Sequence, residues 1–262
     1  MRMQNVPVGD VQIAYATSGE GPPLVLLHGG WCDSRAWRWQ LDGLGGDFAV
    51  TAWEAPGCGQ SSDPPTEWRM PEYADCLAAW LEAAGIERPH VLGLSWGSSL
   101  ALELYRRHPQ VSASLVLVGA YAGWAGSLPA EIVAERLQRA LGELERPPEE
   151  WVAGYLPGFF AEAPPADLAD EIVRMMCDLH PAGTRTMMHA MAEADLRDVL
   201  PRIQVPTLLL YGESDARSPL DIAEALHAGI PGSQLVVLPG VGHFANAERP
   251  REFNEAVRRF LL

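Results

Sequence analysis

Short apolar runs bounded by glycine and proline alternate along the chain with longer stretches in which apolar residues recur at helical spacing. The apolar runs predict strands at residues 11–15, 24–27, 49–53, 90–94, 115–118, 207–211 and 234–238. The amphipathic stretches predict helices at residues 35–44, 71–84, 96–107, 220–228 and 251–261. A turn signal at Val8-Gly9-Asp10 indicates that the first two predicted strands could form an antiparallel hairpin at one edge. This alternation predicts an α/β fold with a mostly parallel sheet covered by helices.

The alternation stops between about residues 121 and 200. Helices are predicted there in succession, around residues 129–141, 149–160, 167–180 and 183–200, with no convincing strand. We interpret residues 122–200 as an all-helical cap, a lid subdomain inserted into an α/β core made of residues 1–121 and 201–262. Such a cap would lie over the strand ends, where ligands bind in this class of fold. The alternative is a set of ordinary crossover helices, although a crossover needs only about a dozen residues.

Charge and composition remove several classes of function. The 262 residues carry a formal net charge of −15, and all 19 basic residues are arginine. A field of this sign repels phosphate backbones, so nucleic acid is not an expected partner. The lack of lysine excludes Schiff-base chemistry and a P-loop lysine. The four cysteines have no metal-ligand spacing, so we interpret them as free intracellular thiols and predict neither a metal nor a cofactor.

The sequence also bears on location and assembly. No apolar run approaches the roughly 20 residues that span a membrane, and the first ten residues lack the apolar stretch of a secretion signal. We therefore expect a cytoplasmic protein with no membrane partner. The length allows one large domain with an inserted subdomain, and we expect a monomer or a homodimer.

The stretch Gly93-Leu94-Ser95-Trp96-Gly97 falls where a strand should end and a helix should begin. A sharp strand-to-helix turn strains its middle residue, and small residues two before and two after avoid a clash. Such a turn exposes the serine oxygen and points the first amides of the helix at a nearby negative charge. Ser95 is therefore a candidate nucleophile. The plain alternative is a serine in a tight turn.

A serine nucleophile needs a base and a group that orients the base. His243 lies in a glycine-rich loop between the last predicted strand and the last predicted helix. Asp215 comes just after the strand at residues 207–211, between serine and histidine in the chain. Glu213 and Asp221 compete with it, but Glu213 comes earlier in the turn and Asp221 belongs to the next predicted helix. We predict a triad of Ser95, His243 and Asp215.

The order serine, aspartate, histidine, with the serine on such a turn, resembles the α/β-hydrolase superfamily over nearly the whole chain. Four motifs carry the resemblance: LLHGGW (residues 26–31), GLSWG (93–97), YGESD (211–215) and GVGHF (240–244). The resemblance implies an eight-stranded, mostly parallel sheet. It also implies an oxyanion hole formed by the backbone amides of Gly30 and Trp96, although Trp31 could shift the first donor by one residue. His28 is interpreted as a residue that organises this loop.

One segment departs from the family pattern. In residues 53–65, WEAPGCGQSSDPP, Glu54 stands where many members with a cap have aspartate, and Cys58 replaces a commonly larger residue. These changes concern loop packing and leave the predicted triad untouched. They weaken any assignment to a narrow subfamily.

A serine nucleophile favours acyl transfer through an acyl-enzyme and argues against the dehalogenases and epoxide hydrolases of this fold, which use aspartate. Trp31 and Trp124 are the predicted walls of the substrate site, and the aromatic and methionine content of the cap favours an apolar substrate. The negative net charge disfavours anionic substrates, although a local arginine could reverse that.

We predict a carboxylesterase-like serine hydrolase acting on a small or medium apolar ester or lactone. The serine motif is also similar to that of proline iminopeptidases, so such an aminopeptidase remains an alternative. Hydrolysis of a C–C bond in a diketone is another. A non-catalytic ligand receptor on the same fold is the alternative from another class.

Overall fold

The computed structural model describes residues 2–262, and these form one eight-stranded sheet in the order β1-β2-β4-β3-β5-β6-β7-β8. The strands are β1 (Arg2–Val8), β2 (Val11–Ser18), β3 (Pro23–Leu27), β4 (Ala49–Trp53), β5 (His90–Leu94), β6 (Ser114–Val118), β7 (Thr207–Gly212) and β8 (Gln234–Leu238). β2 pairs antiparallel with β1 and with β4, and the other pairings are parallel. The predicted eight-stranded, mostly parallel sheet is confirmed.

The hydrophobic pattern did not predict β1. None of its residues is fully buried, and Pro7 lies within it, so it has no continuous apolar run. Proline fits here because β1 is an edge strand, where a missing backbone donor is tolerated. The predicted turn is present: β1 and β2 pair antiparallel up to Val8 opposite Val11, and Gly9 between them has φ 56°. The hairpin is not formed by the first two predicted strands, because the strand predicted at residues 24–27 is β3, which pairs with β4 and β5.

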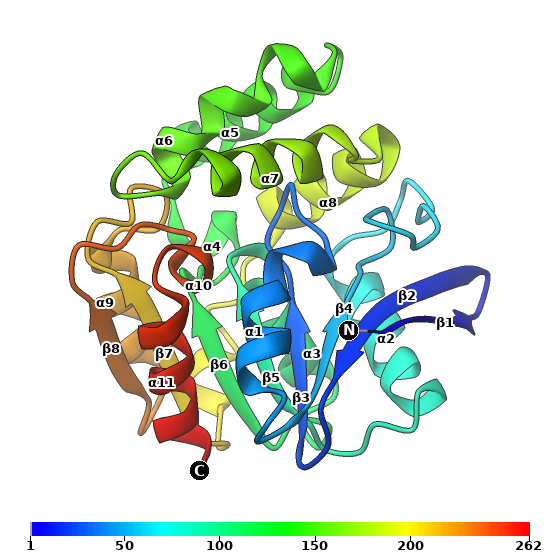
Figure 1. The fold of residues 1–262 in the computed structure, drawn as a ribbon, viewed down its shortest axis with the longest axis vertical. Coiled ribbons are helices and arrows are strands. Elements are labelled where there is room, and N and C mark those ends of the chain that lie inside the picture. The colour runs from blue at the N-terminus through cyan, green and yellow to red at the C-terminus, as the bar shows by residue number, and fades with distance from the viewer. Residues whose placement is uncertain (1) are drawn as a thin grey trace.

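Helices cover both faces of the sheet, and its inner strands β6 and β7 are buried at every residue. Helices α1 (Arg38–Leu44) and α11 (Pro250–Leu261) lie on one face, and α2 (Met70–Ala83), α3 (Trp96–Arg107) and α9 (Leu220–Gly229) lie on the other (Figure 1). The helix predicted at residues 35–44 begins as the 3-10 turn η1 (Ser34–Trp37) and continues as α1. The short helix α10 (Ala245–Glu248) before α11 was not predicted.

The segment between β6 and β7 is helical and contains no strand in the structure, which describes all of it. Its helices are α4 (Trp124–Ser127), α5 (Ala130–Glu143), α6 (Leu156–Phe159), α7 (Ala166–Cys177) and α8 (Pro181–Glu193), with 3-10 turns η2 (Pro148–Glu150), η3 (Val152–Tyr155) and η4 (Leu200–Arg202). Figure 1 shows α5 to α8 together beyond one end of the sheet. We refer to α4 to α8 and their connections as the inserted helices. Their assignment as a separate lid subdomain, with boundaries at residues 122 and 200, stays a prediction.

Two predicted helices in this segment differ from the structure. The helix predicted at residues 149–160 is divided into η2, η3 and α6, in a stretch that contains one proline and two glycines, the residues least suited to a helix interior. The helix predicted at residues 183–200 ends at Glu193. The next residue is extended, and the amide of Leu196 donates to the carbonyl of Ala122 at 2.9 Å. A tertiary hydrogen bond therefore replaces further helical turns.

Three arginine–carboxylate ion pairs join the inserted helices to the starts of α1 and α2 in the α/β core. Arg35 meets Asp178 at 2.7 Å, Arg38 meets Glu171 at 2.6 Å, and Arg69 meets Glu193 at 2.8 Å. All three arginines are partly exposed, so each pair contributes only about 0–1 kcal/mol to the free energy of unfolding.

None of the helices in residues 2–262 is both long enough and apolar enough to cross a membrane.

Candidate active site

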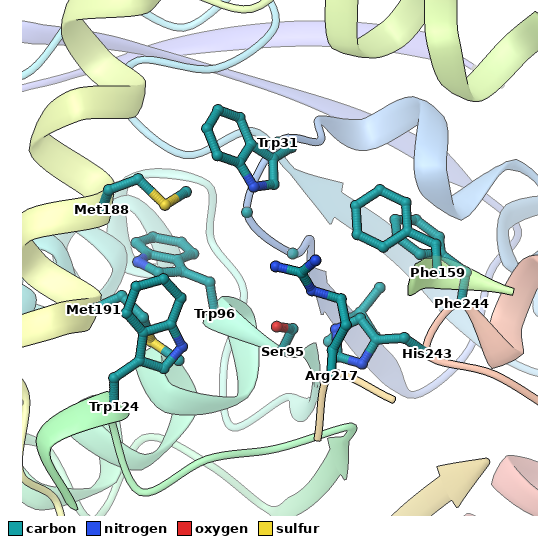
Figure 2. Close-up of a pocket in the computed structure, with 13 residues that line it drawn as sticks. Trp31, Ser95, Trp96, Trp124, Phe159, Met188, Met191, Arg217, His243 and Phe244 are labelled. Atoms are coloured by element: carbon teal, nitrogen blue, oxygen red, sulfur yellow. The ribbon is translucent and has the colours of Figure 1, made fainter. Parts of the chain in front are cut away.

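A sharp turn holds Ser95 between the end of β5 and the start of α3. Its backbone has φ 53° and ψ −111°, a region that residues other than glycine rarely adopt. A Cβ on Gly93 would overlap the carbonyl oxygen of Gly97, and a Cβ on Gly97 would overlap that of Leu27. The two glycines of the motif are therefore needed for steric reasons. The turn places Ser95 in a pocket at the strand ends (Figure 2).

Two residues with unpaired backbone amides line the same pocket. Gly30 follows β3, and Trp96 is the first residue of α3. Neither amide donates a hydrogen bond to a protein group within residues 2–262. The first amides of a helix lack intrahelical acceptors and carry the positive end of the helix dipole. Both amides are thus available to a negatively charged oxygen next to Ser95.

His243 and Asp215 are in direct contact, and both are buried. The Nδ1 atom of His243 lies 2.7 Å from Oδ2 of Asp215. The other carboxylate oxygen accepts the backbone amides of Arg217 at 2.9 Å and Ser218 at 2.8 Å. Because a carboxylate accepts hydrogen bonds, the contact requires the hydrogen on Nδ1. Nε2 of His243 is then the ring nitrogen that can accept a proton.

Gly119, directly after β6, lies against His243 and Asp215 and leaves room for their contact because it has no side chain. Its φ is 49°, and a Cβ there would lie 2.9 Å from Nδ1 of His243 and 3.1 Å from Oδ2 of Asp215. Any larger residue would push the imidazole away from the carboxylate. The sequence showed a glycine at this strand end, but it did not show which side chains approach it.

A narrow pocket of about 30 Å³ brings the predicted site residues together. Ser95, His243 and Trp96 line it (Figure 2), and so does Gly30. Asp215 does not line the pocket but contacts His243, which does. Each of these residues comes shortly after the end of a strand: β3, β5, β7 or β8. The carboxyl ends of these parallel strands meet at this edge of the sheet. The three predicted triad residues, far apart in the sequence, therefore converge in space.

The competing acids make other contacts. Glu213 is exposed and accepts the amide of Gly240 at 2.9 Å. Asp221 lies in the first turn of α9 and accepts the amide of Ile222 at 2.9 Å. Neither carboxylate is hydrogen-bonded to His243.

His28 organises its loop from a buried position. Its Nδ1 contacts the carbonyl of Gly29 at 2.8 Å, and its Nε2 accepts the amide of Ala55 at 3.1 Å. Burial lowers the pKa of His28, in keeping with a neutral imidazole that donates on one side and accepts on the other. Both ring nitrogens are thus occupied, and His28 is not free to act as a base.

Glu54, which departs from the family pattern, is also used inside a loop. It accepts the Ser34 hydroxyl at 2.6 Å and the amide of Gln60 at 2.6 Å. Burial raises the pKa of this carboxyl.

In the part of the chain that the structure describes, no group of three or more histidine, cysteine or acidic side chains is arranged to hold a metal.

Aromatic and methionine side chains form most of the pocket wall. Trp31 and Trp124, both predicted from the sequence, line it together with Phe159, Met188 and Met191 from the inserted helices. Trp31 has φ 68° and packs against Trp151 and Tyr155 with ring centroids 5.1 and 5.4 Å apart. The wall also includes Phe244, next to His243. The sequence indicated an apolar site but could not identify Phe159, Phe244 or the two methionines individually.

Sequence reasoning also missed Arg217. This residue lines the narrow pocket together with Ser95, and Figure 2 shows its guanidinium within that pocket. Arg217 further lines an adjoining cavity of about 320 Å³, which shares Trp31, Trp124 and Met188 with the pocket. The sequence offered only one signal: Arg217 follows Asp215 by two positions.

Comparisons with known proteins agree over nearly the full length of the chain. A sequence model described as the alpha/beta hydrolase family matches residues 24–256. A pyrrolizixenacetamide deacetylase from Xenorhabdus hominickii is 28% identical, with 99% of this chain and 98% of that protein covered. A protein named carbamate hydrolase RutD, from Azorhizobium caulinodans, is 31% identical, with 96% of each chain covered.

Solved structures are similar as well. A thermophilic esterase from Thermogutta terrifontis, with malate bound, matches with a TM-score of 0.90 and 28% identity. The match covers 100% of this chain and 98% of that one.

Proposed function

This chain belongs to the alpha/beta hydrolase family, and on that basis we propose that it is a serine hydrolase with Ser95 as nucleophile, His243 as base and Asp215 as the acid that orients the base. The observation that carries the proposal is the buried contact between His243 and Asp215, 2.7 Å long, in a pocket that also contains the strained Ser95. A structural serine would need neither the strain nor a histidine at the same pocket.

The chemistry follows from the position of each group. Ser95 Oγ attacks the carbonyl carbon of the substrate while Nε2 of His243 takes its proton. The amides of Gly30 and Trp96 stabilise the resulting oxyanion, and loss of one such donor typically costs about 100- to 1,000-fold in turnover. The protonated His243 donates to the leaving alcohol. Water activated by His243 then hydrolyses the acyl-enzyme and restores Ser95.

We propose a carboxylic ester or lactone of small to medium size as the substrate. The pocket at Ser95 is narrow and mostly apolar, which suits a short chain, and a thermophilic esterase is among the similar structures. Amide or carbamate hydrolysis is the second candidate, because the two relatives named above are called a deacetylase and a carbamate hydrolase. Both reactions use the same acyl-transfer steps.

An aminopeptidase is less well supported. Such an enzyme binds the free ammonium group of its substrate, and a carboxylate near the nucleophile suits that task. Within residues 2–262 no acidic side chain lines the pocket at Ser95, whereas Arg217 does. A cationic substrate would be repelled there.

Labelling with a fluorophosphonate tests the nucleophile. We expect the wild type to be labelled, Ser95→Ala not to be labelled, and Ser233→Ala, a serine outside the pocket, to be labelled like the wild type. Rates on p-nitrophenyl esters of several chain lengths, compared with the corresponding anilides and with proline p-nitroanilide, then separate esterase, amidase and aminopeptidase. An unlabelled wild type would overturn the proposal and favour a non-catalytic ligand receptor.

A further inference from the structure

Arg217 is a pocket residue whose guanidinium lacks a polar partner. Within residues 2–262 it forms no ion pair and no side-chain hydrogen bond. Its contacts are with aromatic rings: Cζ lies 5.2 Å from the ring centroid of Tyr155 and 5.3 Å from that of Phe159. The chain has 34 acidic residues, yet none of those described pairs with this cation.

Arg139 provides a contrast within the same region. Its guanidinium lies 5.3 Å from the same Tyr155 ring, but it is also bonded to Glu143 at 3.0 Å. Stacking on Tyr155 is therefore compatible with a carboxylate partner. At Arg139 the protein supplies that carboxylate, and at Arg217 it does not.

The loop that carries Arg217 is fixed through its backbone. The amide of Arg217 donates to Asp215 at 2.9 Å, and its carbonyl accepts from the Tyr121 hydroxyl and from Arg136 at 3.2 Å. Because these bonds hold the main chain, the side chain extends into the pocket from a fixed point. The carboxylate that orients His243 thus also positions Arg217.

An unpaired guanidinium at a partly buried position is costly, because water solvates it poorly there. Burial lowers the pKa of Arg217, and the neighbouring Arg136 acts in the same direction. A carboxylate that entered the pocket would form charge-assisted hydrogen bonds with the planar guanidinium group, and would restore the missing solvation.

We propose that Arg217 binds a carboxylate on the substrate, so that the enzyme prefers esters or lactones that carry an anionic group. This inference rests on the proposed function for the bond that is cleaved. It replaces the expectation of a purely apolar substrate. The aromatic and methionine wall contacts the chain of such a substrate, and Arg217 contacts its charged end.

Matched substrates test the proposal. Monomethyl glutarate carries the carboxylate on the acyl side, and 3-acetoxypropanoate carries it on the alcohol side. The ω-carboxamide of each is the neutral counterpart. For at least one pair we expect the wild type to show a kcat/KM about 10- to 100-fold higher for the carboxylate. Arg217→Met should abolish this preference, because the loss in kcat/KM should fall mainly on the carboxylate, the only member of each pair that makes the charged contact.

Two further variants control the result. Arg217→Lys keeps the charge without the forked donors and should retain part of the preference. Arg259→Met removes the same charge from an exposed position on α11 and should leave the preference unchanged. If the wild type hydrolyses these substrates without preferring either carboxylate, or if Arg217→Met loses equally on both members of a pair, the inference is overturned and Arg217 has a packing role.

A binding measurement keeps this inference separate from the proposed function. Ser95→Ala is titrated with the same carboxylates and carboxamides by calorimetry. We expect tighter binding of a carboxylate by about 10-fold or more, lost in Ser95→Ala/Arg217→Met. If the wild type hydrolyses none of these substrates but Ser95→Ala shows this difference, the proposed reaction fails and the carboxylate site stands. Equal binding of carboxylates and carboxamides would remove the carboxylate site.

Discussion

The strand-end loops and the inserted helices build the two halves of one pocket in different ways. Ser95, Asp215 and His243 come from loops that follow strands, and each is fixed by backbone strain or by short hydrogen bonds. The inserted helices supply Phe159, Met188 and other apolar side chains, with partly exposed ion pairs at their edges. The loops thus set the geometry of the proposed reacting groups, and the helices set the shape of the space around them.

The largest expected effect comes from the loops. Asp215→Asn keeps an oxygen for the two loop amides but removes the negative charge beside His243 and favours the wrong tautomer. We expect kcat to fall by about 10⁴-fold. Steady-state kinetics on a p-nitrophenyl ester measures this, with Glu213→Gln as the control that should stay within a few-fold of the wild type. A large loss in Glu213→Gln instead would make Glu213 the orienting acid.

Gly119→Ala should misplace His243, the proposed base, without removing it. The added Cβ would lie 2.9 Å from Nδ1 of His243, and the residue has φ 49°, so the imidazole or the loop must shift. A misplacement of the imidazole by about 1 Å is expected to lower kcat by about 100-fold. Gly142→Ala is the matched control, because a Cβ there meets nothing within 4 Å. Equal activities in the two variants would show that the site tolerates movement of the imidazole.

Met188 tests the role of the inserted helices. Its Cε would lie 3.0 Å from a Cβ on Gly30, so it closes the pocket at the predicted oxyanion hole. In Met188→Ala we expect longer acyl chains to gain about 10-fold in kcat/KM relative to acetate, because about 1.4 kcal/mol of obstruction is a factor of ten. The rate ratio over a p-nitrophenyl ester series measures the change.

Met176→Ala is the control for this variant. Met176 is fully buried on α7 but does not line the pocket. Both variants should lose about 2–5 kcal/mol in free energy of unfolding, measured by urea denaturation. Only Met188→Ala should change chain-length selectivity. A similar change in Met176→Ala would indicate that the helices move as a unit and that the wall is not set by individual residues.

The smallest effect is expected at the ion pairs. Glu171→Gln removes the partner of Arg38, a pair with one half-exposed member, and should lower the free energy of unfolding by less than about 1 kcal/mol. For a chain of this length that corresponds to a melting-point shift of no more than about 4 °C. A larger loss, measured by thermal unfolding, would show that this pair helps to hold the inserted helices in place.

The sequence predicted best the parts of the structure that local sterics dictate. The GxSxG turn is an example, because its two glycines are required by contacts within the strand-to-helix connection itself. The helix predicted at residues 96–107 has the same bounds in the structure. In contrast, β1 was missed because it lies at an edge and has no apolar run, and the end of α8 depends on the distant carbonyl of Ala122.

The same distinction applies to the site. Ser95, Asp215 and His243 stand at strand ends, and parallel strands bring such positions to one edge of the sheet. Arg217 also follows β7, but its side chain enters the pocket because the turn after Asp215 is held by Tyr121 and Arg136. No local pattern shows those bonds. The approach of Gly119 to His243 likewise exists only in three dimensions.

The anchoring of residue 217 has a consequence for how this enzyme can change. Its loop is tied down by its own amide and carbonyl groups, which every residue except proline presents in full. Position 217 can therefore be exchanged without disturbing the proposed nucleophile, base or acid. In a library randomised at codon 217, selection on anionic, neutral and cationic esters would recover different side chains at this position, with Ser95, His243 and Asp215 unchanged.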